Sequence, residues 1–245
     1  MKKIKYEIGI DSRDIDLFHY LHSVKIATIG QIGRDCYYNL ADPGLYKRLL
    51  RLEKVGMLQG HISSLSNRKK IYHITRKCFN NFIKKSDLKR NELKSDAIQH
   101  DLCLVEIRKT LLQSKLVNSY VTENTLQTFP IRNLGEQYEP FVRNNSDAAI
   151  KLVVNETPIY FALELELTLK NKQRISEKIK SYYSESGISR VLYVVDNSTS
   201  INLIISQEKK VDTNKKAKFF YTTYNRLIHD KDTSFSNWKK EKITF

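Results

Sequence analysis

Glycine and proline are scarce in this chain of 245 residues, which holds 8 Gly and 4 Pro. Their scarcity leaves little room for flexible linkers. The 3 cysteines form no CxxC pair, which favours reduced, buried thiols over a disulfide framework. No apolar run approaches the ~20 residues that a membrane-spanning helix needs. The first residues, MKKIKYEIGIDSRD, contain no apolar signal-peptide segment, so we expect a cytoplasmic protein without membrane insertion.

Acidic residues are few near the start of the chain. Residues 1–90 hold 19 Lys and Arg against 8 Asp and Glu, whereas the other 155 residues hold 23 against 19. Most of the formal net charge of +15 therefore falls in the first third. A basic excess concentrated in one segment indicates a polyanionic partner, most often nucleic acid.

Three helices and a hairpin are predicted in residues 1–90. Apolar spacing predicts helices over 12–23 and about 28–37. A third helix is expected in ADPGLYKRLLRLEKVG, with Asp42 as its cap, Pro43 in its first turn and Gly56 at its end. Two short strands follow around a polar turn at 64–67. This order is that of a winged helix-turn-helix, in which the third helix enters the major groove and the hairpin grips phosphate.

Basic side chains gather on the predicted third helix and hairpin. The leucines of that helix fall on one face, so its cations face solvent on the other. A solvated basic face, or a hairpin used for dimerisation, is the alternative interpretation. The residues expected to contact DNA, mainly at phosphate, are Lys47, Arg51, Lys54, Arg68, Lys69 and Lys70.

A second domain is expected over residues 91–245. It opens with helical sequence up to about residue 116, and strands are predicted near 119–126, 147–155, 159–169, 190–196 and 218–224, with helices near 170–185 and 201–208. This order predicts an α+β protein whose second domain is built on one central mixed sheet.

Two glutamates interrupt an apolar run in IYFALELELTL. If residues 155–158 form a turn, the flanking strands make a hairpin whose side chains alternate between two faces. Pairing Val154 with Ile159 joins the apolar faces and sets Asp147 opposite Glu166 on the other face, beside Glu164. Oxygen-rich clusters of this kind suit Mg²⁺ or Mn²⁺. The alternative is a solvated face that Lys151 partly neutralises.

A basic helix follows this hairpin. Lys170, Arg174 and Lys178 repeat along the polar side of a helix whose buried stripe is expected at Ile175 and Ile179. A lysine beside a carboxylate cluster suits phosphodiester cleavage, because the ammonium stabilises charge on the phosphoryl oxygens. At least one of Tyr182 and Tyr183 on the same helix is expected to pack in the core, although either could instead form a covalent adduct with DNA.

The segment SDAAI…FALELELTLKNKQRISEKIKSYY resembles the PD-(D/E)xK restriction-endonuclease-like nucleases. More narrowly, it resembles the replication-relaxation family, which includes the MobC-type plasmid relaxases. The resemblance implies a winged helix before a nuclease-like domain, covers most of the chain in architecture, and has specific motifs only at about 145–183. By position it implies catalytic Asp147, Glu164, Glu166 and Lys170, with Mg²⁺ or Mn²⁺ on the three carboxylates and, more weakly, on Glu123, expected on an earlier strand.

The chain departs from the family pattern at two positions. Ser146 stands where a proline usually precedes the aspartate, and Glu166 fills the usual lysine position, so the lysine must come from Lys170 or Lys178. The resemblance implies an endonuclease that nicks a plasmid transfer origin, alone or with other mobilisation proteins, and a homodimer is compatible with it.

Two other functions are weighed against the nickase. One is a winged-helix regulator or replication-initiation factor whose nuclease-like domain is silent. The other is a histidine-cluster relaxase, which the sequence disfavours because His19 and His22 are its only close histidine pair.

Overall fold

The computed structural model describes residues 9–66, 68–84, 87–90, 92–168 and 171–245. The chain divides into two compact units, Met1–Val105 and Glu106–Phe245, and each is described by itself. Together they give a mixed α+β protein, which confirms the predicted fold class at that level. No helix within the described residues is long and apolar enough to cross a membrane.

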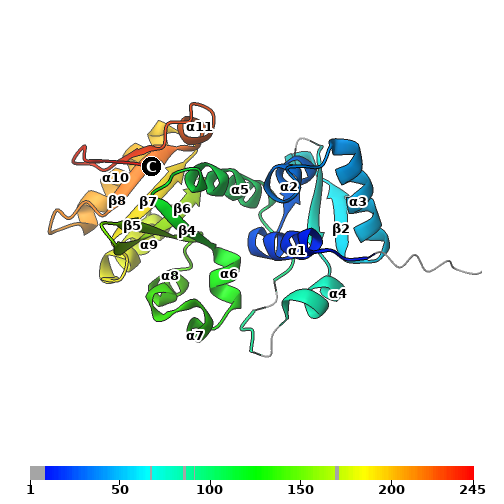
Figure 1. Cartoon of the computed structure of the whole chain (residues 1–245). Coiled ribbons are helices and arrows are strands. Elements are labelled where there is room, and N and C mark those ends of the chain that lie inside the picture. The colour runs from blue at the N-terminus through cyan, green and yellow to red at the C-terminus, as the bar shows by residue number, and fades with distance from the viewer. Residues whose placement is uncertain (1–8, 67, 85–86, 91, 169–170) are drawn as a thin grey trace, which may run out of the picture. The chain divides into compact units, whose positions relative to one another are not determined.

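The first unit places three helices beside a small antiparallel sheet with strand order β1-β3-β2 (Figure 1). Its core is formed by the apolar faces of the helices and of β3, including Phe18, Leu49 and Tyr72. The elements are α1 (Ser12–Val24), β1 (Ala27–Thr28), α2 (Ile29–Cys36), α3 (Asp42–Lys54), β2 (Leu58–Ile62), β3 (Lys70–Ile74), α4 (Arg76–Cys78) and a π-helical turn, Phe79–Ile83.

Local signals explain where these helices begin and end. Asp11 and Asp14 form a capping box at α1, so the N-cap is Asp11. Helix α3 begins at Asp42 after Ala41, whose side chain makes no capping hydrogen bond, so the prediction of Asp42 as the cap is wrong by one residue. Gly56 has φ +74° just after the helix, the left-handed conformation that glycine tolerates best, as its predicted role requires.

The second unit contains a seven-stranded mixed sheet within the described residues, with strand order β10-β9-β8-β7-β6-β5-β4. The pairs β6–β7 and β7–β8 are parallel, and β4–β5, β5–β6, β8–β9 and β9–β10 are antiparallel. Its strands are β4 (Val117–Thr122), β5 (Ala148–Val154), β6 (Thr157–Glu166), β7 (Arg190–Val195), β8 (Phe219–Thr223), β9 (Ser234–Ser236) and β10 (Lys242–Thr244).

Helices connect these strands. Ile175, Ile179 and Tyr182 of α9 pack with Ile204 of α10 and with side chains of β5 to β8 in one core cluster. The helices are α5 (Ile98–Leu112), α6 (Glu123–Thr128), α7 (Ile131–Leu134), α8 (Glu139–Arg143), α9 (Lys172–Ser184), α10 (Ser198–Val211) and α11 (Tyr224–Ile228) (Figure 1).

The division between the units falls inside α5, after residue 105, whereas the predicted domain boundary lay at 90/91. The first half of α5 packs on the first unit. Leu102 clusters with Ile26 and Ile71, Val105 joins the main core, and the Gln31 side-chain amide donates to the Leu102 carbonyl at 3.2 Å. Residues 98–105 are thus part of the first core.

The β5–β6 hairpin has its predicted faces, but its predicted register is wrong by two residues. Ala148 pairs with Leu163 and Val154 with Thr157, not with Ile159. The cause is the turn, because Asn155 and Glu156 form a two-residue connection with φ +48° and +65°. A shift of two preserves which side chains share a face. It brings Asp147 level with Glu164 rather than with Glu166.

Candidate active site and nucleic-acid interface

Three carboxylates lie where β5 begins and β6 ends. Asp147 directly precedes β5, and its Oδ2 accepts the backbone N–H of Leu165 at 2.7 Å. Glu164 and Glu166 stand near the end of β6 and are only 7% and 8% exposed. The strand therefore carries both glutamates into a protected environment, and the aspartate is fixed to the backbone between them.

Lys178 supplies the cation beside this cluster. Its ammonium nitrogen lies 3.0 Å from Oε1 of Glu164 and donates to the carbonyl oxygens of Asn144 and Asn145, at 3.0 and 3.3 Å. Helix α9 positions it, because Ile175 and Ile179 on either side are buried against the sheet. The structure therefore brings Lys178 to Glu164. Lys170, the other lysine named by the sequence, lies outside the described residues.

Tyr182 closes the cluster from the core side. Its hydroxyl donates to Oε1 of Glu164, and the Ser146 hydroxyl donates to the phenolic oxygen, with 2.7 Å between the two oxygens. The ring is fully buried against Phe219. The predicted core role of Tyr182 is confirmed, and the structure adds a polar contact that packing alone did not predict.

Burial sets the protonation of Glu164. The pKa of Glu164 is raised from 4.5 to about 7, chiefly by its removal from water and also by the nearby charge of Asp147. Lys178 and the Tyr182 hydroxyl oppose both effects by favouring the carboxylate. The pKa of Tyr182 rises well above its ordinary value through burial and the adjacent Glu164. Glu164 is thus poised to exchange a proton near neutral pH.

The remaining predicted ligands are less closely gathered. Glu123 begins α6 instead of lying on the earlier strand, so its predicted place is wrong by one residue, although its backbone N–H donates to the Asp147 carbonyl at 2.8 Å. Glu166 lies two residues beyond Glu164 on the same face. Over the described part of the chain, no three His, Cys, Asp or Glu side chains form a group that could hold a metal ion.

The predicted DNA-contact residues divide into exposed and engaged cations. Lys70 pairs with Glu53 at 2.6 Å and lies over the Tyr72 ring, so its charge is partly neutralised within the first unit. The others point into solvent from α3 and from the β2–β3 turn: Lys47, Arg51, Lys54, Arg68 and Lys69.

Two buried polar groupings were missed by sequence reasoning. In the first unit Asp14 is fully buried and accepts hydrogen bonds from Arg48 and from the Tyr37 hydroxyl. In the second, Glu208 is fully buried and accepts from the hydroxyls of Tyr183 and Tyr221, at 2.7 Å each. The sequence signal was weak, because each group joins residues from separate elements.

Comparison with known proteins identified no relative of this chain. No protein-family model, curated protein or solved structure matches this chain.

Proposed function

We propose that this protein is a metal-dependent DNA endonuclease that nicks one strand at an origin carried by a plasmid or other mobile element. The observation that carries the proposal is the meeting of Asp147, Glu164 and Lys178 in the second unit. It joins two carboxylates and an ammonium, the side-chain types that phosphodiester cleavage by the PD-(D/E)xK nucleases uses. The resemblance stated for residues 145–183 supports the same reaction.

The first unit would bind the DNA. Its order of three helices and a hairpin supports a winged helix-turn-helix, in which α3 would enter the major groove. Lys47, Arg51 and Lys54 are exposed on α3, and Arg68 and Lys69 are exposed at the hairpin turn. Cations in these two places would contact phosphates and set the register of the protein on the duplex.

The second unit would carry the chemistry. After α5 and β4 the chain passes through α6, α7 and α8 to the antiparallel β5–β6 hairpin, then through α9 to β7, which is parallel to β6; the order from β5 to β7 supports a restriction-endonuclease-like core. The hairpin bears the acids, and the helix bears the lysine. Ser146, which replaces the usual proline, also has a role here. Its hydroxyl donates to the hydroxyl of Tyr182, which in turn donates to Glu164.

The acidic side chains here are of the kind that a hard divalent cation binds, although no three of them form a metal-holding group within the described residues. Asp147 and Glu164, with Glu166 on the same face, are the residues that would hold Mg²⁺ or Mn²⁺. Such a cation polarises the scissile phosphate and lowers the pKa of a bound water. The chain's own part is to hold Asp147 on the Leu165 N–H, to keep Glu164 away from bulk water, and to offer Lys178 to the charge that develops on the phosphoryl oxygens.

A second candidate is a DNA-binding regulator or replication-initiation factor whose second unit is catalytically silent. One observation favours it, namely that Oε1 of Glu164 already receives both Lys178 and Tyr182. A carboxylate satisfied in this way has no need of a metal ion. The two functions share DNA binding by the first unit and differ only in cleavage.

The test separates binding from cleavage. Supercoiled plasmid carrying the element's own origin is incubated with the protein in Mg²⁺, in Mn²⁺ or in EDTA, and binding to a linear origin fragment is measured in parallel. The proposal predicts binding in every buffer and open circles only with metal. Tight binding without open circles in either metal would leave the regulator as the function.

A further inference from the structure

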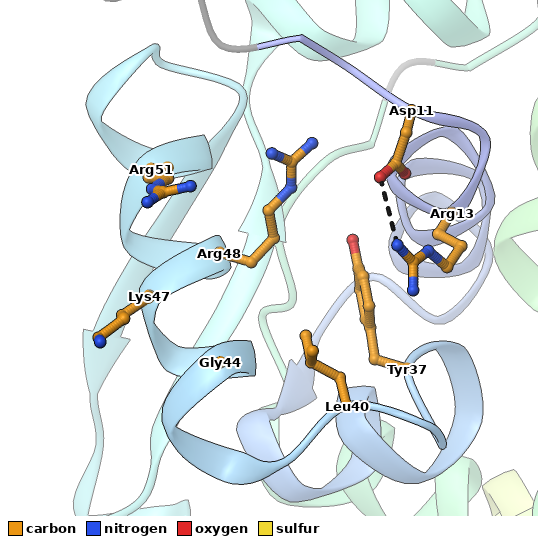
Figure 2. A pocket seen from close by; sticks show the side chains of 8 residues that line it. All are labelled: Asp11, Arg13, Tyr37, Leu40, Gly44, Lys47, Arg48 and Arg51. Carbon is orange, nitrogen blue, oxygen red and sulfur yellow. Dashed lines mark ion pairs between the residues drawn. The ribbon is translucent and has the colours of Figure 1, made fainter.

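A cavity of about 320 Å³ opens in the first unit between α3, the start of α1 and the segment after α2. Three arginines line it, Arg13 from α1 and Arg48 and Arg51 from α3, and Tyr37 forms part of its wall (Figure 2). Its volume is at the small end of the roughly 300–1,000 Å³ typical of ligand sites, so the part of a ligand that enters it should be a small group.

The charges around this cavity are only partly balanced. Arg13 lies 3.6 Å from Asp11, and Arg48 is paired with the buried Asp14. Arg51 is exposed and has no salt bridge to any residue that the structure describes. Lys47 adds a further exposed cation at the rim, where Figure 2 shows its side chain extending away from the other residues. The cavity therefore carries excess positive charge, and the mutual repulsion of its cations would be relieved by an anion.

Arg48 is held in place before any ligand arrives. Its Nε donates to Oδ1 of Asp14 at 2.9 Å, its Nη2 donates to the Gly9 carbonyl at 2.8 Å, and the Tyr37 hydroxyl also donates to Asp14. Asp14 itself is fully buried, and its pKa is held below 3.8 by the hydrogen bonds from Arg48, Tyr37 and the backbone of Asp11, which outweigh the effect of burial. Asp14 and Gly9 thus occupy Nε and Nη2 and leave Nη1 of a fixed guanidinium for a ligand, at little further cost in side-chain entropy.

We propose that this cavity binds a phosphate group, with the exposed Arg51 as the main donor and Arg48 offering its remaining Nη1. Guanidinium groups match the geometry of phosphate oxygens through paired N–H donors. The phosphate has two candidate sources: a free nucleotide, or a backbone phosphate of DNA lying along α3. The second source rests on the proposed DNA binding, and the first does not.

The probes are inorganic phosphate and a nucleoside 5′-monophosphate, titrated into the full chain by calorimetry, with the unphosphorylated nucleoside as the blank. We expect both phosphates to bind and the nucleoside not to bind. Arg51→Gln should weaken phosphate binding about tenfold, the effect of one charge-assisted hydrogen bond. Lys54→Gln is the matched control, because it removes an equal exposed charge from the same helix at a residue that does not line the cavity, and it should change the affinity less than about twofold.

Arg51→Lys distinguishes binding by paired hydrogen bonds to phosphate from attraction by positive charge alone. It keeps the cation, loses the paired donors, and should fall between wild type and Arg51→Gln. Competition identifies the source: displacement of bound duplex by the monophosphate assigns the cavity to a backbone phosphate, and simultaneous binding assigns it to a free nucleotide. Absence of phosphate binding by the wild-type chain, or equal losses in Arg51→Gln and Lys54→Gln, would overturn the proposal. Neither result depends on whether the protein nicks DNA.

Discussion

The ammonium nitrogen of Lys178 lies 3.0 Å from Oε1 of Glu164, so a helix and a strand of the second unit are joined by an ion pair at a protected site. Lys178 also donates to two backbone carbonyls, and Glu164 also accepts from Tyr182. The pair is thus the centre of a hydrogen-bonded group that extends through Tyr182 to Ser146, and the charge of Asp147 lies close enough to act on Glu164. Its chemistry can be tested one partner at a time.

Replacing Lys178 by Gln should raise the pKa of Glu164 above 7. The positive charge of Lys178 lowers that pKa in the wild type, and its loss leaves burial and Asp147 unopposed except by Tyr182. We expect a rise of about one pH unit or more, measured from the carboxyl carbon of labelled glutamate by NMR. Lys180→Gln is the control, since Lys180 is exposed two residues further along α9. An unchanged titration in Lys178→Gln would show that the ion pair does not form in solution.

Glu164→Gln should remove a pH dependence of stability. The pKa of Glu164 is about 7 in the folded chain against an ordinary 4.5, so the folded state binds the proton more tightly. The contribution of Glu164 to stability should therefore be fully present below pH 4.5, fall as the pH rises towards 7, and stay level above it. The free energy of unfolding of the variant relative to wild type should increase by about 3 kcal/mol across that range. Urea unfolding at pH 4 and pH 8 measures the difference, and parallel curves for the two proteins would contradict the assignment.

Tyr182→Phe tests whether this tyrosine is structural or forms a covalent link to DNA. The change keeps the packing against Phe219 and removes one buried hydroxyl, which should lower the free energy of unfolding by about 1–2 kcal/mol. Because the account assigns attack on the phosphate to water, nicking should persist in the variant at a reduced rate. Complete loss of nicking in a folded Tyr182→Phe protein, with a covalent DNA adduct in the wild type, would make the tyrosine the nucleophile.

Lys69→Gln and Lys70→Gln should differ in their effect on DNA binding although they are neighbours. Lys69 is exposed, whereas Lys70 is paired with Glu53 at 2.6 Å. We expect Lys69→Gln to reduce the magnitude of the slope of log affinity against log salt concentration by about 1, which corresponds to the loss of one phosphate contact. Lys70→Gln should change the slope much less. Fluorescence anisotropy on an origin duplex at several salt concentrations gives both slopes. Equal slopes for the two variants would remove the β2–β3 turn from the interface.

Much of the site could be predicted because strand alternation is a strict rule. It put Asp147, Glu164 and Glu166 on one face without any structure. The register could not be predicted from this rule. A two-residue turn at Asn155 and Glu156 and a four-residue turn at 155–158 give the same alternation of side chains between the two faces. The sequence also could not choose between Lys170 and Lys178 as the catalytic lysine, because the choice depends on the path of the chain between β6 and α9, which begins at Lys172.

The first unit shows a second limit of sequence reasoning. The buried leucines of α3 and the exposed cations opposite them follow from helical spacing, and both were predicted. The burial of Asp14 with Arg48 was not, because the two residues are 34 positions apart and nothing in the chain marks the aspartate as buried. The division of the units after residue 105 could not be predicted for a related reason, since the composition around residues 98–105 does not show that Leu102 and Val105 pack on the first core.

The most direct test of the account is the nicking of supercoiled origin plasmid by Asp147→Asn beside wild type, with binding to the same origin measured for both. Asp147→Asn keeps the size of the side chain and an oxygen for the Leu165 N–H, but removes the charge. We predict metal-dependent open circles from wild type, loss of at least about a hundredfold in rate from the variant, and equal DNA affinity for the two proteins. Undiminished nicking by Asp147→Asn in a preparation free of other nucleases would contradict the account.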